Sequence, residues 1–511
     1  MSSGPDFGSF ARLYESGVSQ VIHRRVVDDL ETPVSAYLKL AKGRSHPFLF
    51  ESVEGGAWRG RYSIITFDPD LIWRCRGDEA EVSEGDDIKA GVFRKQVGGA
   101  LDSLKDLVAR TRMDLPAELP PMAAGLFGAI GYDMVRLVER LPHVNPDPLG
   151  LPDGIMTRPS IVAIFDSIGQ EIVLVTTVRP SGADAKAAWD AAQGRLDRVV
   201  ADLAQPLERS AEAPTPREQA AFTSPFTRET YGEAVEKAKA YIRAGDIFQV
   251  VPSQRFRAPF DLPPFALYRS LRRLNPSPFL FFLDFGGFQL VGSSPEILVR
   301  LRDGKITIRP IAGTRPRGKT PEEDLALEQE LLADPKERSE HLMLLDLGRN
   351  DVGRVAMLGE ERRNAGTPRK RGPAVRVTQS FVIERYSHVM HIVSNVEGDA
   401  PEGVDPVDVL MAALPAGTLS GAPKVRAMEI IDELEVEKRG LAYAGAAGYI
   451  SANGSVDACI LLRTACVKDG AMYVQAGGGV VADSDPDAEY DETMHKSRAL
   501  KRAAEEAWRF S

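Results

Sequence analysis

Two pairs of glutamates lie at helical spacing in segments far apart in the chain. Glu337 and Glu340 stand in KERSEHLMLLDLGRND, and Glu489 and Glu492 stand in DAEYDETMHKSRALKR. Because residues three apart share one face of an α-helix, each pair predicts two carboxylates that point the same way. Mg²⁺ prefers hard oxygen donors, so four converging carboxylates would suit a magnesium site. One such pair alone is usually a solvated helix face, and the repeated spacing favours a metal.

Acid–base chemistry has two candidates outside these helices. Glu296 follows a predicted strand end in GSSPE and could act as a general acid if burial raised its pKa. His391 alternates with apolar neighbours in SHVMHIVSN, where a histidine is more often structural than catalytic. Arg463 lies in the apolar predicted strand ILLRTACV and needs an anionic partner, either a ligand carboxylate or a structural ion pair.

Three glycine-rich segments could bring the backbone close to a ligand. PIAGTRPRG, residues 310–318, reads as a basic glycine turn after a strand-like run. GAPKVRAMEII, residues 421–431, predicts a glycine turn that feeds a helix capped by Thr418 or Ser420, and a helix N-terminus attracts anions. QAGGGVV, residues 475–481, either admits a ligand beside its glycines or is a simple hairpin or bulge.

The elements that must position these groups follow from local patterns. Thr227 caps a predicted helix that ends at Gly245 and leads into a strand. Thr320, followed by proline and glutamate, predicts a second helix start, with a break at Asp334–Pro335. Strand-like runs joined by short glycine turns favour antiparallel pairing. We therefore predict an α+β fold in which two large mixed or antiparallel sheets are flanked by helices.

Amino-acid composition predicts where the chain divides into regions and which classes of partner it excludes. Proline, alanine and charge replace apolar periodicity at residues 203–227, which predicts a linker between an N-terminal region, 1–202, and a catalytic domain, 228–511. A net charge of −10 without a basic block argues against nucleic acid as a partner. No signal-peptide pattern and no long apolar run are present, which predicts a soluble, cytoplasmic protein that does not bind membranes.

Taken together, these segments resemble the chorismate-utilising enzymes, and among them the anthranilate synthase large components. The likeness runs from about Thr227 to the end of the chain and extends upstream through ESVEGGAWRGRYSII. It implies one substrate cleft between large sheets, bound Mg²⁺, and chemistry on chorismate. The shared motifs, in the family's order, are FQVVPSQRF, NPSPFLFFL, SSPE, PIAGTRPRG, SEHLMLLDLGRND, VMHIVSNV, LSGAPKVRAME, YAGAAGY, ILLRT, QAGGGVV and EYDET.

The resemblance implies a metal site built from the two glutamate pairs. Glu340 and Glu492 would ligate Mg²⁺, and Glu337 and Glu489 would lie one shell further out, through water. Chorismate is a dianion, so Mg²⁺ together with Arg463 would offset its charge, while backbone N–H groups at glycines supply donors.

The resemblance also implies roles around the substrate. Glu296 would protonate the departing C4 hydroxyl as ammonia adds at C2, and His391 would assist the later loss of pyruvate. Gln249 and Thr314 would lie beside the reacting groups. The residues implied to contact the substrate are Gly313, Thr314, Lys424, Tyr443, Arg463, Gly477, Gly478 and Gly479.

Two positions separate the branches of the family. Isochorismate and salicylate synthases carry a water-activating lysine where this chain has Gln249, and a neutral amide is a poor base for water. Component I of aminodeoxychorismate synthase carries a nucleophilic lysine where this chain has Ala312, which cannot form an amine adduct. The resemblance thus favours a lyase that makes anthranilate through aminodeoxyisochorismate. The alternatives are those other synthases and, outside enzymes, a catalytically silent regulatory subunit.

A partner and an inhibitor follow from the same likeness. Cys75, Cys459 and Cys466 lie in no GxCxG-like turn, so ammonia is expected from a separate glutamine amidotransferase subunit, component II. Two large and two small subunits would form a heterotetramer. Relatives bind tryptophan as a feedback inhibitor, and the alternative for the matching residues is packing between two regions. Those residues are Glu51, Ser52, Pro278, Phe279 and Leu280.

Overall fold

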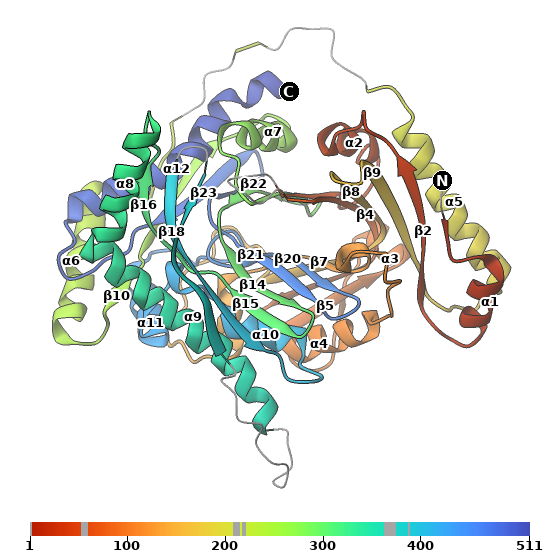
Figure 1. Ribbon diagram of the computed structural model, residues 1–511, viewed down its shortest axis with the longest axis horizontal. Helices are drawn as coiled ribbons and strands as arrows, with labels where there is room; N and C mark the ends of the chain where they lie inside the picture. The colour runs from red at the N-terminus through yellow and green to blue at the C-terminus, as the bar shows by residue number, and fades with distance from the viewer. Residues whose placement is uncertain (1–2, 53–59, 208–214, 217–220, 362–374, 387–388) are drawn as a thin grey trace.

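Antiparallel strands form the body of the molecule in the computed structural model, which describes residues 3–52, 60–207, 215–216, 221–361, 375–386 and 389–511. Hydrogen bonds connect 21 strands into one continuous curled sheet, beside a separate two-stranded ribbon. Every strand pairing found within these ranges is antiparallel. Helices lie around the sheet (Figure 1), so the predicted α+β class is confirmed. The two large sheets of the prediction are instead one, because hydrogen bonds between β3 and β12 and between β7 and β20 join the strands of both parts of the chain.

The helices lie on several sides of this sheet. Figure 1 places α1 and α5 at the edge near the N-terminus, α7 and α12 near the C-terminus, and α8 and α9 along β16 and β18. The α-helices are α1 (Phe7–Glu15), α2 (Pro33–Leu40), α3 (Asp86–Ala90), α4 (Ala100–Thr111), α5 (Ala185–Leu203), α6 (Arg228–Ala244), α7 (Pro264–Leu274), α8 (Pro321–Ala333), α9 (Pro335–Glu361), α10 (Pro406–Ala413), α11 (Lys424–Leu434) and α12 (Pro486–Glu506). The 3₁₀ helices are η1 (Pro121–Ala123), η2 (Tyr132–Leu137), η3 (Gly417–Leu419) and η4 (Ala507–Phe510).

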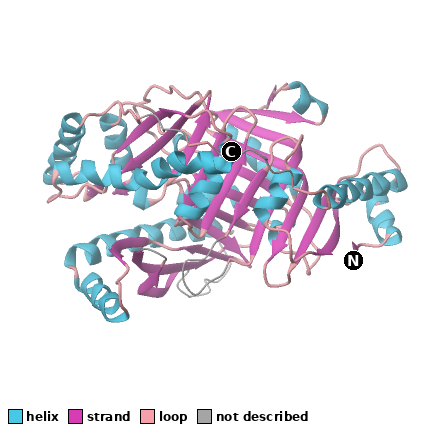
Figure 2. Cartoon of the chain, turned by 90° about the horizontal axis from the view of Figure 1, so that it is seen from above, coloured by secondary structure: helices cyan, strands magenta, loops and turns pink. Residues whose placement is uncertain are grey.

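The strands cross the middle of the molecule when it is seen from above (Figure 2). Those of the first part of the chain are β1 (Ser3–Gly4), β2 (Gln20–Val27), β3 (Phe48–Glu51), β4 (Tyr62–Arg76), β5 (Glu79–Glu84), β6 (Arg94–Lys95), β7 (Gly125–Ile130), β8 (Gly154–Asp166) and β9 (Glu171–Val178). Those of the second part are β10 (Gln249–Val250), β11 (Ser253–Pro259), β12 (Phe279–Asp284), β13 (Gln289–Ser294), β14 (Ile297–Arg302), β15 (Lys305–Ile308), β16 (Ile311–Pro316), β17 (Val375–Arg385), β18 (Val389–Asp399), β19 (Gly421–Ala422), β20 (Ala446–Ser451), β21 (Val456–Ile460), β22 (Thr464–Lys468) and β23 (Ala471–Gly477).

Strands from the two parts of the chain pair directly with each other. β3 pairs with β12, which sets Glu51 opposite Leu280, and β7 pairs with β20 along its whole length. Of the predicted linker, residues 208–214 and 217–220 lie outside the described residues, and Thr223 bridges Arg257. The division into 1–202, 203–227 and 228–511 stays a prediction, while the sheet itself runs through both larger parts.

Helix boundaries follow the capping chemistry. The Thr227 side chain caps α6, which ends at Gly245 with a left-handed φ of 85°. The Thr320 hydroxyl accepts a hydrogen bond from the Glu323 N–H at 3.2 Å and so caps α8. α8 ends at Ala333, and after Asp334 the second helix α9 starts at Pro335, because proline has no N–H to continue the first helix. These predicted starts and the predicted break are confirmed.

The prediction that PIAGTRPRG forms a glycine turn is wrong. Most of the segment is strand β16, which pairs with β18. Gly313 lies at a bulge with φ of 69°, where the pairing steps from Ala312 opposite Ile392 to Thr314 opposite His391. Glycine enters this left-handed conformation without the steric cost that a side chain adds, so it marks a bulge inside the strand.

Two other local predictions are also wrong. ILLRTACV is not one strand: β21 ends before Arg463 and β22 begins after it, with Arg463 between them at φ of 48°. The helix α11 has Pro423 at its N-cap and no side-chain cap. The Thr418 hydroxyl donates to Glu296 instead, and the Ser420 hydroxyl donates to the Ala416 carbonyl at 2.9 Å.

Candidate active site

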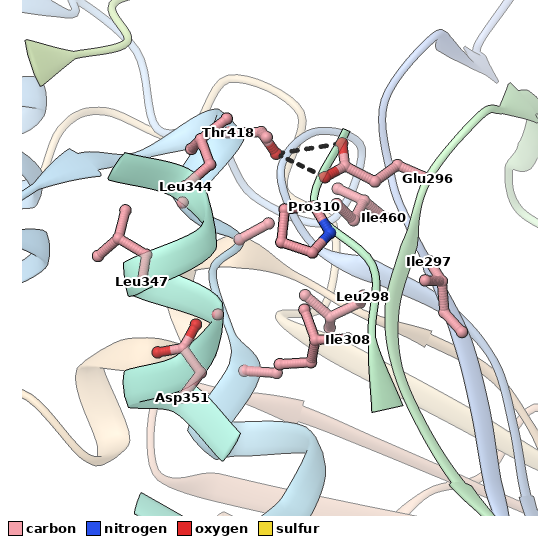
Figure 3. A pocket seen from close by; sticks show the side chains of 14 residues that line it. Glu296, Ile297, Leu298, Ile308, Pro310, Leu344, Leu347, Asp351, Thr418 and Ile460 are labelled. Atoms are coloured by element: carbon pink, nitrogen blue, oxygen red, sulfur yellow. Dashed lines mark hydrogen bonds between the residues drawn. The ribbon is translucent and has the colours of Figure 1, made fainter. Parts of the chain in front are cut away.

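A buried glutamate lies at the start of β14. Glu296 is 8% exposed, and the Thr418 hydroxyl donates to its Oε2 at 3.2 Å (Figure 3). A cavity of about 30 Å³ extends from the carboxylate between β14 and α9, past Leu344, Ile460 and Asp351. Burial raises the pKa of Glu296 to about 8, even though Thr418 favours the charged form. At neutral pH this side chain holds a proton that it can donate.

A neutral histidine lies across the ladder from the β16 bulge. His391 Nδ1 is 3.0 Å from the Thr314 hydroxyl and 3.1 Å from the Gly313 carbonyl oxygen. Burial lowers the pKa of His391 to about 4, so the imidazole is uncharged at neutral pH. In the tautomer whose Nδ1–H donates to the Gly313 carbonyl, Nε2 keeps its lone pair and can accept a proton.

The two glutamate pairs approach each other from α9 and α12. Burial raises the pKa of Glu340, and the charges of Glu337 and Glu492 raise it further. Burial also raises the pKa of Glu489, again with Glu492 adding to the effect. One carboxylate shifts the pKa of another only when the two are close. The two helices therefore bring the four carboxylates near enough to interact.

Two cations that the sequence analysis did not assign lie among these carboxylates. Arg315 Nη1 donates to Glu337 at 2.9 Å, and Lys496 Nζ contacts Glu492 at 2.6 Å. The sequence held a signal for Lys496, which follows Glu492 by four residues on one helix face. Arg315 stands inside PIAGTRPRG, but its partners come from α8 and α9 and no local pattern reveals them.

The carboxylate donors fit a hard divalent cation in their chemistry. Glu489 Oε2 is buried and accepts no hydrogen bond within the described residues, so it has an unused lone pair in a negatively charged region. Among the same residues, no three His, Cys, Asp or Glu side chains are already grouped closely enough to hold a metal. A divalent cation would relieve the repulsion among the carboxylates, and the magnesium site stays a prediction.

The glycine run lies against Gln249 and the carboxylates. A Cβ added at Gly479 would overlap Gln249 Nε2, and one added at Gly478 would lie 2.5 Å from Glu489 Oε2. Gln249 Nε2 donates to Glu340 at 3.3 Å, and Gln249 Oε1 is buried without a partner among the described residues. The glycines therefore let an amide and a carboxylate approach the backbone.

The remaining residues assigned to the substrate have different surroundings. Tyr443 is buried with its hydroxyl beside Gly477, 3.1 Å from where a Cβ would lie. Burial lowers the pKa of Arg463, and Glu296 opposes that shift only in its ionised form, so an anionic ligand would stabilise the guanidinium. Lys424 instead pairs with buried Asp351, 2.8 Å from both carboxylate oxygens, so its charge is already matched.

The residues assigned to a tryptophan site meet at the junction of β3 and β12. Glu51 is buried and accepts hydrogen bonds from Tyr268 and from Arg272, the latter at 2.7 and 2.9 Å. Leu280 lies opposite Glu51 in the ladder, Phe279 is the first residue of β12, and Pro278 precedes it. Ser52 follows Glu51, and residues 53–59 beyond it lie outside the described residues.

Comparisons with known proteins identify relatives along almost the whole chain. Residues 78–502 match the family described as chorismate binding enzyme. The chain is 56% identical over 506 residues to anthranilate synthase component 1 of Cereibacter sphaeroides, covering 99% of this chain and 98% of that protein. It is 47% identical over 501 residues to the protein of the same name from Pseudomonas aeruginosa, covering 97% of each.

A solved structure agrees with these sequence matches. The crystal structure of anthranilate synthase component I from Streptococcus pneumoniae TIGR4 matches with a TM-score of 0.73 at 35% identity, covering 88% of this chain and 94% of that chain. Across the described ranges, no helix combines the length and apolar character needed to cross a bilayer.

Proposed function

The chain belongs to the family of chorismate binding enzymes, and from this premise we propose that it is the large component of an anthranilate synthase. It would act as a lyase that converts chorismate and ammonia to anthranilate, pyruvate and water, through aminodeoxyisochorismate. The observation that supports the choice within the family is Gln249, a neutral amide hydrogen-bonded to Glu340. By the resemblance it stands where the water-using branch carries its activating lysine, and a neutral amide is a poor base for water. Ala312, buried in β16, likewise offers no amine nucleophile.

Opposite pKa shifts support Glu296 as the acid of the reaction and His391 as its base. Glu296, with a pKa of about 8, would give its proton to the C4 hydroxyl as that group leaves as water and ammonia adds at C2. His391, neutral because burial lowers its pKa to about 4, would assist the loss of pyruvate by taking the ring proton. Two groups whose surroundings move their pKa values apart suit these two roles.

The binding groups supply charge and orientation. Arg463 would hold a substrate carboxylate, with the Tyr443 hydroxyl and the backbone of the glycine run beside it. Glu340 and Glu492 would hold Mg²⁺, with Glu337 and Glu489 behind them. Bound Mg²⁺ would neutralise a substrate carboxylate and fix its orientation.

Ammonia would come from a separate amidotransferase subunit. All three cysteines of the chain, Cys75, Cys459 and Cys466, are buried. Burial raises the pKa of each thiol to about 12, so none is a thiolate at neutral pH. A chain without a reactive thiol cannot release ammonia from glutamine by the cysteine route. Feedback inhibition by tryptophan at the β3–β12 junction and a heterotetramer complete the proposal.

Product identification tests this function. The purified chain, given chorismate, Mg²⁺ and ammonium salt, is expected to form anthranilate, followed by its fluorescence. Glutamine in place of ammonium is expected to give no product until an amidotransferase subunit is added. Isochorismate or aminodeoxychorismate as the product would refute the assignment, and turnover with glutamine alone would refute the division of labour.

A further inference from the structure

A buried ion pair lies behind the candidate active site. Arg439 is 2% exposed, and its Nε and Nη2 donate to the Glu435 carboxylate at 2.6 to 3.1 Å. Glu435, just after α11, is buried as well and accepts from both the N–H and the hydroxyl of Ser253, at 2.8 and 2.7 Å. The pair lies too deep to be a surface ion pair, and it contacts none of the four glutamates of the metal prediction through a hydrogen bond within the described residues.

The other contacts of this guanidinium reach two backbone segments of the site. Arg439 Nη2 donates to the Val251 carbonyl at 2.6 Å, and Nη1 donates to the Leu419 carbonyl at 2.6 Å. Val251 follows the strand that carries Gln249, and Leu419 follows Thr418, the donor to Glu296. One side chain thus links the two segments that place the amide and the hydroxyl, beside a direct backbone hydrogen bond from the Val251 N–H to the Ser420 carbonyl at 3.0 Å.

The same side chain packs on a third part of the site. The guanidinium carbon of Arg439 lies 5.3 Å from the centre of the Tyr443 ring and 4.8 Å from that of Tyr132. Tyr443 is 3% exposed, with its hydroxyl beside Gly477. A cation against an aromatic face is attracted by the ring quadrupole, so the orientation of Tyr443 depends in part on where Arg439 lies.

The segments that carry Gln249 and Thr418 are joined by a short two-stranded ribbon. β10 and β19 pair with each other, with Gln249 opposite Ala422 and Val250 opposite Gly421. This ribbon has only two strands, and outside it Val250 forms one antiparallel bridge, to Val480 just after β23. A two-stranded ribbon is marginally stable by itself, so a clamp across its end would act together with the Val480 bridge to fix how Gln249 is held.

We propose that Arg439 is the positioning residue of this cleft, fixing Gln249 through Val251 and Thr418 through Leu419. The role rests on the proposed function, because it is defined by the chemistry of these side chains. Arginine suits this position because the N–H groups of its planar guanidinium donate to two carbonyls and one carboxylate at fixed angles. A lysine ammonium is a single point charge and cannot match that geometry. A displacement of catalytic groups by about 1 Å can cost about a hundredfold in rate.

The first test measures hydrogen exchange, which needs no turnover. In Arg439→Lys, the segments 247–254 and 416–423 are expected to exchange faster than in wild type, while the large sheet keeps its protection. Arg426→Lys is the matched control, because Arg426, in α11 upstream of Arg439, also pairs with acidic side chains, Asp246, Glu429 and Glu433, but is one-third exposed. If Arg439→Lys does not fold, Glu435→Gln provides the same comparison. Unchanged exchange in both segments, or faster exchange spread evenly over the chain, would overturn the positioning role.

The second test measures the pH dependence of kcat/KM. The Thr418 hydroxyl, the Ile311 N–H and the charges of Arg463 and Lys496 favour the charged form of Glu296. The titratable side chain of Tyr386 also lies near it, because the charge of Glu296 raises the pKa of that phenol. Thr418→Val removes one of the groups that favour the charged form, so the alkaline limb is expected to move about half a pH unit higher. Arg439→Lys is expected to move the limb the same way and to lower kcat/KM about a hundredfold.

The combined variant separates positioning from general damage. If Arg439 acts through Thr418, then Arg439→Lys moves the limb no further in a Thr418→Val background. In Arg439→Lys, the alkaline fall of kcat/KM could instead occur at the same pH as in wild type, with kcat/KM lowered equally at every pH. That result would refute the proposal. If wild type makes no anthranilate at all, the proposed function fails while the exchange experiment still decides the role of Arg439.

Discussion

Replacing Glu296 by glutamine is expected to make the enzyme slower and more stable at the same time. With its ordinary pKa of 4.5 a glutamate is only about 0.3% protonated at pH 7, whereas at a pKa of about 8 it is about 90% protonated. Burial therefore raises the acid-competent fraction about 300-fold. Glu296→Gln removes this acid and is expected to lower kcat by about 10²- to 10⁴-fold.

The stability effect has the opposite sign. The pKa of Glu296 is higher in the folded protein than in the unfolded chain, so stability is fully present below pH 4.5 and is lost as the pH rises through 8. At pH 7 the free energy of unfolding of the wild type is lower, by on the order of 3 kcal/mol, than it would be with a neutral side chain at this position. The difference is larger at pH 9. Glutamine stays neutral, so Glu296→Gln is expected to resist urea better than wild type, increasingly so up to about pH 9.

Both effects can be measured on one set of variants. Anthranilate fluorescence is followed from pH 6 to 9.5 with the concentration of free ammonia, rather than total ammonium, held constant. Urea unfolding is measured over the same range, with Glu505→Gln on the exposed face of α12 as control. An activity like that of wild type would remove Glu296 as the acid, and an alkaline stability no higher than that of wild type would refute the raised pKa of its carboxyl.

Three further outcomes are expected. Gly479→Ala should displace the Gln249 amide from Glu340, lowering kcat/KM at least tenfold with little change in the urea midpoint; unchanged kinetics would show that the close approach is not needed. Glu340→Gln should abolish the response of activity to Mg²⁺ while the chain stays folded, and a normal Mg²⁺ titration would remove Glu340 from the metal site. Ser52→Phe should weaken inhibition by tryptophan at least tenfold without altering kcat, whereas coincident inhibition curves would exclude Ser52 from the inhibitor site.

Sequence patterns predicted the features that depend on neighbouring residues. The α8 cap at Thr320, the break at Pro335 and the end of α6 at Gly245 each follow from which backbone groups a side chain can satisfy or deny. The shared helix faces of the glutamate pairs follow from helical geometry alone. Such rules act within a few residues, so they hold without knowledge of the fold.

Features that depend on distant partners were missed or assigned wrongly. PIAGTRPRG has the composition of a turn, yet pairing with β18, about 80 residues later, makes it a strand. Thr418 has the position of a helix cap, yet its hydroxyl is used by Glu296 from another part of the chain. Arg315 contacts three carboxylates, and Arg439 reaches the carbonyls of Val251 and Leu419 in two distant segments. Glu435 lies four residues before Arg439, but nothing near either arginine in the sequence reveals these other partners.

The pairing of β7 with β20 delays completion of the sheet during synthesis, because β20 is made long after β7. At about 5 to 20 residues per second, a ribosome needs about 15 to 60 s to pass from the end of β7 to the start of β20. During that interval one edge of β7, a strand buried throughout in the finished protein, has no partner. An unpaired apolar edge is a template for aggregation. Chaperone supply and translation speed should therefore govern how much soluble protein a cell obtains, and chains stopped short of residue 446 should aggregate even though β8 is already in place.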